Sequence, residues 1–287
     1  MQHIEQARGI PLGKDDFPAF GNFQLTLWPA LLLLLIVFFF FEVTTADLTV
    51  QDFFFNFSTG EWMVDRNSPF LKWIVYDGAK KAIEAFAVFL LVLMCGPRRW
   101  LDFFHIPDPA RRRLLVVILT LATVPALVGF IKHRSYVACP WDIQRYGGDL
   151  PYLRVMEPYA PGSRPDHLTT SFPAAHPSGG FALLALAGLA ETRRRKRLGI
   201  AIGLGMGTIM GLYQMAKGAH YLSHVLITGL LAWIGFLVLH KLVVGDQRRM
   251  RSIVAQPALF PASATLAWSS PPATHSARIG EETAAPQ

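Results

Sequence analysis

The sequence predicts an all-α membrane protein, a polytopic bundle of six transmembrane helices. Hydrophobic residues make up 52% of the 287 residues, and the mean hydropathy of +0.33 is too high for an ordinary soluble protein. The apolar residues are gathered into six blocks, which charged or polar segments separate. Basic residues gather in the connections that a six-helix arrangement places on one side of a membrane. Composition, blocks and charge therefore indicate the same class of protein.

Three of the apolar blocks are long enough to cross a bilayer by themselves. Residues 17–41 form a run of 25 without a charge, residues 114–131 a run of 18, and residues 198–216 a run of 19. The first block is too long for the apolar core of a signal peptide and no small-residue cleavage site follows it, so we interpret it as a retained helix. Three shorter blocks reach full length when their moderately polar flanks are included: 85–97, 177–190 and 225–239.

The basic clusters predict how the helices are oriented. They all fall on one side of the six-helix arrangement, at residues 98–99, 111–113, 193–197 and 241–251. Positive charge gathers on the cytoplasmic side of membrane proteins, so both termini are expected in the cytoplasm. The formal net charge of +7 then reflects topology, and nucleic acid is not an expected partner.

The same orientation divides the chain into regions. Residues 1–16 are expected to form a cytoplasmic lead, residues 17–251 the six-helix membrane domain, and residues 252–287, rich in Ala, Pro, Ser and Thr, a disordered cytoplasmic tail. The outer loops of the domain would be 42–81, 132–176 and 217–224. The first of these loops is rich in aromatic residues, which fit either an element in the lipid headgroup region or a folded cap over the helices.

Three polar segments at the outer helix ends carry the candidate chemistry. They are Lys132–Asp142 after the third helix, Phe172–Gly180 before the fourth, and Lys217–His224 between the fifth and sixth. Titratable residues at such places are costly, so they are candidates for function by default. Phosphoryl transfer needs cations around the phosphate oxygens, a nucleophile in line and an acid for the leaving group. Lysines and histidines can supply all three without a metal.

These segments resemble the three motifs of the type 2 phosphatidic acid phosphatase superfamily of membrane lipid phosphatases, in the same order. The family patterns KxxxxxxRP, PSGH and SRxxxxxHxxxD correspond to residues 132–140, 173–176 and 214–224. The resemblance covers roughly residues 80–245. It is closest to an atypical bacterial branch in which the motifs Cys-Pro-Trp-Asp and Gly-Ala-His-x-Leu-Ser-His are typical.

Three positions depart from the general family pattern. Cys139 and Gln214 stand where the family has arginines, and His224 stands where it has an aspartate. The lysine at position 217 is the natural substitute for the second arginine. Asp142 or Asp149 in the long outer loop is a candidate source of the missing negative charge.

The resemblance implies roles for Lys132, His176 and His220, and the chemistry and spacing of the segments add Lys217, His224 and Arg145 as candidates. His220 would be the nucleophile that forms a phosphohistidine, His176 the general acid, and His224 the residue that accepts a hydrogen bond from His220 and orients it. The residues expected to bind phosphate are Lys132, Lys217 and Arg145.

The resemblance also implies an integral membrane phosphohydrolase or phosphotransferase that cleaves a lipid phosphate or diphosphate at the outer leaflet, without a cofactor or metal. Its implied location is the inner, cytoplasmic membrane of a bacterium, with the site facing the periplasm. The oligomeric state is left open. One alternative is a zinc hydrolase built from His176, His220 and His224, because three histidines can hold a catalytic zinc. Another is a non-catalytic membrane protein, such as a transporter subunit or a lipid-binding scaffold.

Overall fold

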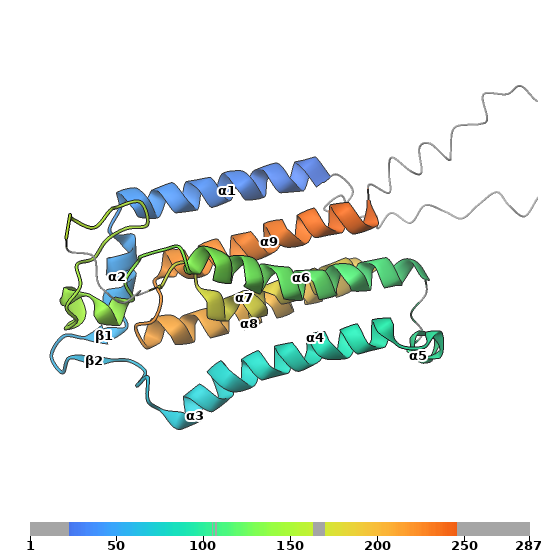
Figure 1. Cartoon of the computed structure of the whole chain (residues 1–287), viewed down its shortest axis with the longest axis horizontal. Helices are drawn as coiled ribbons and strands as arrows, with labels where there is room; N and C mark the ends of the chain where they lie inside the picture. Colours follow the sequence, from blue (N-terminus) through green and yellow to red (C-terminus); the bar gives the residue numbers. More distant parts are fainter. Residues whose placement is uncertain (1–22, 105, 107, 163–169, 246–287) are drawn as a thin grey trace, which may run out of the picture. The chain divides into compact units, whose positions relative to one another are not determined.

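The computed structural model describes residues 23–245, except for residues 105, 107 and 163–169 (Figure 1). The chain divides into two units, Met1–Gln247 and Arg248–Gln287, and all the described residues belong to the first. The expected lead at 1–16 and the expected tail at 252–287 therefore lie outside the described residues.

Helices make up most of the described region. The long ones are α1 (Phe23–Val43), α4 (Ala79–Cys95), α6 (Asp108–Lys132), α8 (Arg193–Ala216) and α9 (Leu222–Val244). The short ones are α2 (Ala46–Asp52), α3 (Pro69–Leu71), α5 (Arg98–Phe103), α7 (Ala175–Ala182), the π-helical η3 (Lys72–Gly78), and the 3₁₀ turns η4 (Pro140–Asp142), η5 (Gln144–Tyr146) and η6 (Leu183–Gly188). An antiparallel hairpin joins β1 (Phe55–Asn56) to β2 (Glu61–Trp62).

Four of the described helices are long and apolar enough to cross a membrane: α1, α6, α8 and α9. The mainly helical class with several apolar spans is confirmed, whereas the count of six is not. The blocks expected at 85–97 and 177–190 correspond to α4, with 17 residues, and to α7 followed by η6, with 8 and 6 residues. Both are shorter than a full membrane span.

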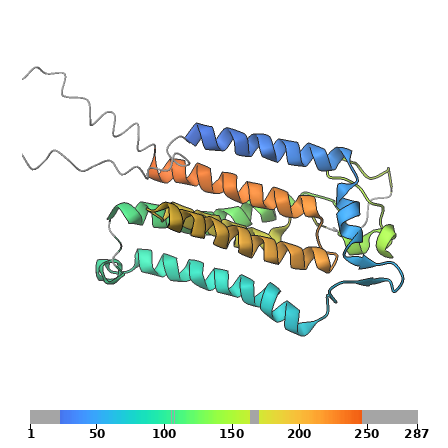
Figure 2. The same ribbon diagram turned by 180° about the vertical axis from the view of Figure 1, so that it is seen from behind.

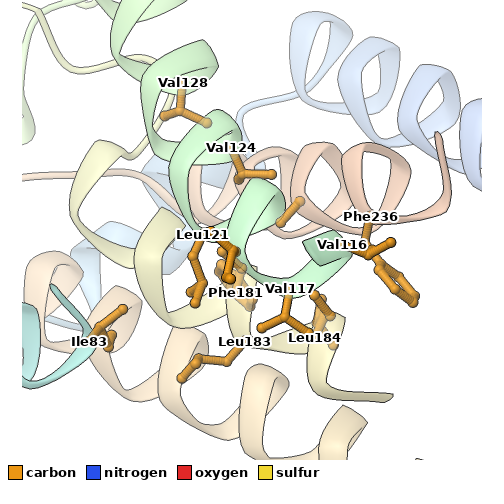
Figure 3. Packing of buried hydrophobic residues seen from close by; sticks show 14 of the residues in the cluster. Ile83, Val116, Val117, Leu121, Val124, Val128, Phe181, Leu183, Leu184 and Phe236 are labelled. Atoms are coloured by element: carbon orange, nitrogen blue, oxygen red, sulfur yellow. The ribbon is translucent and has the colours of Figure 1, made fainter. Parts of the chain in front are cut away.

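The core is organised around α6, which packs against α4, α7, η6 and α9. Val117, Leu121, Val124 and Val128 recur every three or four residues, which places them on one face of the helix, and all four are buried. Figure 3 shows this face against Phe181 of α7 and its neighbours. Between helices in a membrane, close packing rather than the hydrophobic effect supplies most of the attraction.

A ladder of glycines brings α8 into backbone contact with its neighbours. Every fourth residue of α8 is a glycine at positions 199, 203, 207 and 211. A methyl group at Gly199 would lie 2.6 Å from the backbone nitrogen of Ala187, and one at Gly203 would overlap the backbone of Leu184. Small residues at this spacing allow membrane helices to approach closely. The ladder explains how α7 and η6, short as they are, stay fixed in the bundle.

Replacing Gly203 with alanine should therefore destabilise the protein. Because the added methyl meets backbone that cannot rotate away, we expect a loss of about 1–3 kcal/mol. A lower midpoint of thermal unfolding in detergent would show it. Gly205→Ala is the matched control, since nothing lies within 4 Å of its added methyl. Equal midpoints for the two variants would contradict the role assigned to the ladder.

The aromatic segment after α1 forms a folded cap over one end of the bundle, opposite to α5 (Figures 1 and 2). The side-chain nitrogen of Gln51 donates to the carbonyl oxygen of Met215 at 2.8 Å, and the backbone nitrogen of Val64 donates to that of Ala216 at 3.1 Å. These bonds satisfy carbonyls that the end of α8 leaves without helical partners. Of the two interpretations of this segment, the structure shows the cap, although Phe53 and Phe57 are exposed.

Candidate active site

A cavity of about 430 Å³ lies beneath the cap, where α6 ends, α7 begins and α8 ends. Its polar lining includes Lys132, Cys139, His176, Gln214, Lys217 and His220. Apolar side chains of α4, α6 and α8 also line it, among them Ile83, Leu121 and Met210, and so do the charged side chains of Lys80 and Glu84 of α4. The cavity therefore offers both polar and apolar surface to a ligand. All three polar segments that the sequence singled out contribute to it.

His220 is presented by a tight turn after α8. The backbone nitrogens of Gly218 and Ala219 donate to the carbonyls of Met215 and Gln214 and end the helix. Gly218 has a φ of +77°, and the ring of Trp62 fills the place of a side chain there, so no other residue fits without strain. The His220 side chain is 5% exposed. Burial first, then the proximity of His224 and Lys132, holds its pKa well below the usual value, so the ring is neutral at neutral pH.

Ser171 joins His220 to His224. Its hydroxyl oxygen lies 3.3 Å from Nδ1 of His220 and 3.2 Å from Nδ1 of His224, and it donates to the carbonyl oxygen of Ala219 at 3.0 Å. A hydroxyl has one proton. Because Ser171 uses this proton to donate to the Ala219 carbonyl, its hydroxyl oxygen is left to accept hydrogen bonds from the Nδ1–H groups of both histidines. In a neutral ring with Nδ1 protonated, Nε2 carries no proton. The expected hydrogen bond from His220 to His224 is thus replaced by a bridge through Ser171.

His176, the second residue of α7, stands in the cavity wall. Its ring stacks on that of Tyr76, with centroids 3.9 Å apart and planes 5° from parallel. Its Nε2 is buried and has no hydrogen-bond partner in the described part of the protein. A buried polar atom of this kind is costly unless a ligand uses it.

The two lysines lie at the C-terminal ends of helices, where the helix dipole favours positive charge. Lys132 is the last residue of α6, and Lys217 follows the last residue of α8. Lys217 is 9% exposed, and its ammonium lies 4.5 Å from the ring centre of Tyr76 and 4.9 Å from that of Tyr213. Burial, followed by repulsion from Lys72, lowers the pKa of Lys217 to about 8. The cavity thus contains cations beside two histidines.

Comparison with known proteins agrees with this arrangement. Residues 113–248, which carry all three polar segments, match the model of the PAP2 superfamily. This region of the chain is similar to the PAP2 superfamily. The chain is also 24% identical to lipid A 4'-phosphatase from Francisella tularensis subsp. novicida (strain U112) over 201 residues, which are 69% of this chain and 86% of that protein. No solved structure gives a significant match.

Arg145 does not line this cavity. Its guanidinium forms an ion pair with the Asp52 carboxylate at 2.6 Å, and its side chain is 47% exposed. Tyr146 donates to the same carboxylate, so Asp52 ties the long loop after α6 to the cap. The carboxylates suggested as substitutes for the family aspartate, Asp142 and Asp149, are also not among the described residues that line the cavity.

The zinc alternative gains no support from the geometry. Within the described residues, no group of three or more His, Cys, Asp or Glu side chains is arranged to hold a metal ion. His220 and His224 both present Nδ1 to Ser171, whereas His176 is held by Tyr76.

Reasoning from the PAP2 motifs missed three residues around the site. Ser171 and Tyr76 contact the histidines as described above. Asp47 of α2 accepts hydrogen bonds from the backbone nitrogen and the hydroxyl of Ser223, in the first turn of the helix that carries His224. Burial, the largest influence, raises the pKa of Asp47 to about 6. Only Ser171 gives a sequence signal, since it immediately precedes the second polar segment.

Proposed function

We propose that this chain is a metal-independent lipid phosphatase that works through a phosphohistidine. One observation carries the proposal: His176, His220, Lys132 and Lys217, which come from three separate motifs, line one cavity together with apolar side chains. The PAP2 match and the phosphatase relative support the same reaction class. A phosphate headgroup would lie beside the lysines and histidines, and the first part of a lipid tail would lie beside Ile83, Leu121 and Met210.

In the proposed reaction, Nε2 of His220 attacks phosphorus while the bond from phosphorus to the lipid oxygen breaks. His176 donates a proton to that oxygen, which leaves as the lipid alcohol. Water then attacks phosphorus while giving a proton to His176, the bond between phosphorus and Nε2 of His220 breaks, and inorganic phosphate leaves. Lys132 and Lys217 neutralise the phosphate oxygens throughout.

The bridge through Ser171 supports the nucleophile in this scheme. An acceptor for Nδ1–H fixes the tautomer with Nε2 free, and His224 shares that acceptor from the other side. We assign Ser171 and His224 to orientation of His220, and Arg145 to the structure of the cap. This retains five of the six residues expected from the sequence.

We further propose that α4 with η3, and α7 with η6, complete a six-helix membrane domain spanning residues 17–251. The basic clusters support an orientation with the cap outside, since α5 and the start of α8 lie at the end opposite to it (Figure 2). In a bacterium the cavity would then open to the periplasm at the outer leaflet of the inner membrane. The ends, 1–16 and 252–287, would remain in the cytoplasm.

Purified protein in detergent should release phosphate from at least one lipid phosphate. A suitable panel is undecaprenyl diphosphate, lipid A, phosphatidylglycerophosphate and phosphatidic acid, with phosphate measured in excess EDTA and without it. We expect equal rates, because lysines and histidines carry the chemistry. Loss of activity with EDTA that zinc restores would instead support the zinc hydrolase. Failure to cleave any of the four lipids would favour the non-catalytic alternative.

A further inference from the structure

The π-helical segment η3 brings an aromatic ring to the wall of the cavity. Residues Lys72–Gly78 form this segment immediately before α4. π-Helical turns are rare and are frequently found at functional sites, because the extra residue in the turn displaces the side chains that follow it. Of its two large aromatic residues, Trp73 is 68% exposed, while Tyr76 is half-buried and lines the cavity.

The ring of Tyr76 contacts two groups of the proposed mechanism at once. His176 stacks on it in parallel, at 3.9 Å between ring centres. The backbone of the adjacent Val75 lies close to the same imidazole. The ammonium of Lys217 lies 4.5 Å from the centre of the Tyr76 ring. One segment therefore fixes the plane of the imidazole, its rotation and the position of the neighbouring cation.

We propose that Tyr76 is a positioning residue that holds His176 in place as the proton donor and holds Lys217 beside it. This inference rests on the proposed function, in which His176 protonates the leaving lipid oxygen. A parallel ring keeps the imidazole from tilting, and its electron-rich face stabilises the ammonium of Lys217. Both effects come from the face of the ring, and the hydroxyl group of Tyr76 has no part in them.

The experiment compares Tyr76→Leu with Tyr76→Phe and uses Trp73→Leu as the matched control from the same segment. Each variant is assayed on an alkyl lipid phosphate and on 4-nitrophenyl phosphate, whose leaving group departs without a proton. We expect Tyr76→Leu to lower kcat on the lipid about 10- to 100-fold, since a misplaced acid forfeits part of the gain from general acid catalysis. Its loss on 4-nitrophenyl phosphate should be at least tenfold smaller. Tyr76→Phe and Trp73→Leu should stay within about twofold of wild type on both substrates.

His176→Ala separates the failure of this inference from the failure of the proposed function. If His176 is the acid, this variant shows the same dependence on the leaving group, more strongly. An equal loss on both substrates for His176→Ala would remove the proposed acid. Suppose that His176→Ala shows the dependence on the leaving group. If Tyr76→Leu then loses activity equally on both substrates, or loses none, Tyr76 does not position the acid and the inference fails. Inactivity of Tyr76→Phe would also overturn it, because the ring would not suffice.

Discussion

His220→Ala is expected to abolish phosphate release and the covalent phosphate on the protein. The side chain supplies the attacking nitrogen, and no neighbouring histidine is expected to take its place: His224 is not among the described residues that line the cavity, and His176 is the proposed proton donor. Loss of a nucleophile removes the covalent route altogether. When labelled lipid phosphate is mixed with enzyme and the protein is denatured rapidly, label should remain on the wild-type protein and not on His220→Ala.

Ser171→Ala is the companion variant that tests orientation. It retains the nucleophile but removes the acceptor that both Nδ1 atoms share, so we expect activity to fall about 10- to 100-fold, the range for partners that orient a functional histidine. The label should still be trapped. Turnover of lipid phosphate by His220→Ala at nearly the wild-type rate would contradict the nucleophile. An unimpaired Ser171→Ala protein would contradict only the bridge.

Lys217→Ala should lower turnover by roughly one to three orders of magnitude, the range for losing a preorganised electrostatic donor. Gln214 is the matched control, because it lies one turn earlier, lines the same cavity and carries no charge. Gln214→Ala should therefore cost much less. Measured values of kcat and KM for both variants would decide. Equal, mild effects would mean that Lys217 does not replace the family arginine.

The lowered pKa of Lys217 adds a dependence on pH to the same prediction. The ammonium loses its proton as pH rises through about 8, and a neutral amine cannot balance the phosphate charge. We expect kcat/KM, which reports the free enzyme, to decline above that pH. Lys217→Arg should move the decline to higher pH, since a guanidinium stays charged there. If kcat/KM of Lys217→Arg declines at the same pH as that of the wild type, another group causes the decline.

The long apolar helices were predictable because a run without charges is a local signal that only a membrane span explains well. α1, α6 and α8 correspond to such runs, and α9 corresponds to a shorter apolar block that reaches full length with its flanks. α7 and η6 gave a weaker signal because other helices surround them, so their sequence can include Ser178 and Gly180, both buried. A folded cap was one of two interpretations of the aromatic segment, but its contacts could not be derived. The hydrogen bonds of Gln51 and Asp47 join residues 164 and 176 positions apart, and no local pattern encodes them.

The site residues were predictable where a motif exists. The prediction failed where only the folded geometry decides which residues meet. Motif spacing correctly selected His176 and His220 as residues of one cavity. Arg145 was misplaced because its carboxylate partner, Asp52, lies 93 residues earlier in the chain. Tyr76 belongs to a segment with no motif, and its proximity to His176 follows from how α4 and α7 meet. Motifs in the sequence therefore identify the candidate reactive residues, whereas the residues that contact and position them are found only in the folded structure.

The glycine ladder of α8 also predicts how this chain can vary among its descendants. Gly207 belongs to this ladder and faces the ring of Phe181. It can be replaced by a larger residue only if Phe181 is replaced by a smaller one at the same time. Gly205 has open space around it and can change alone. Positions in α7 and α8 should therefore be substituted in pairs, and this coupled variation would record the contact between the two helices in the sequences themselves.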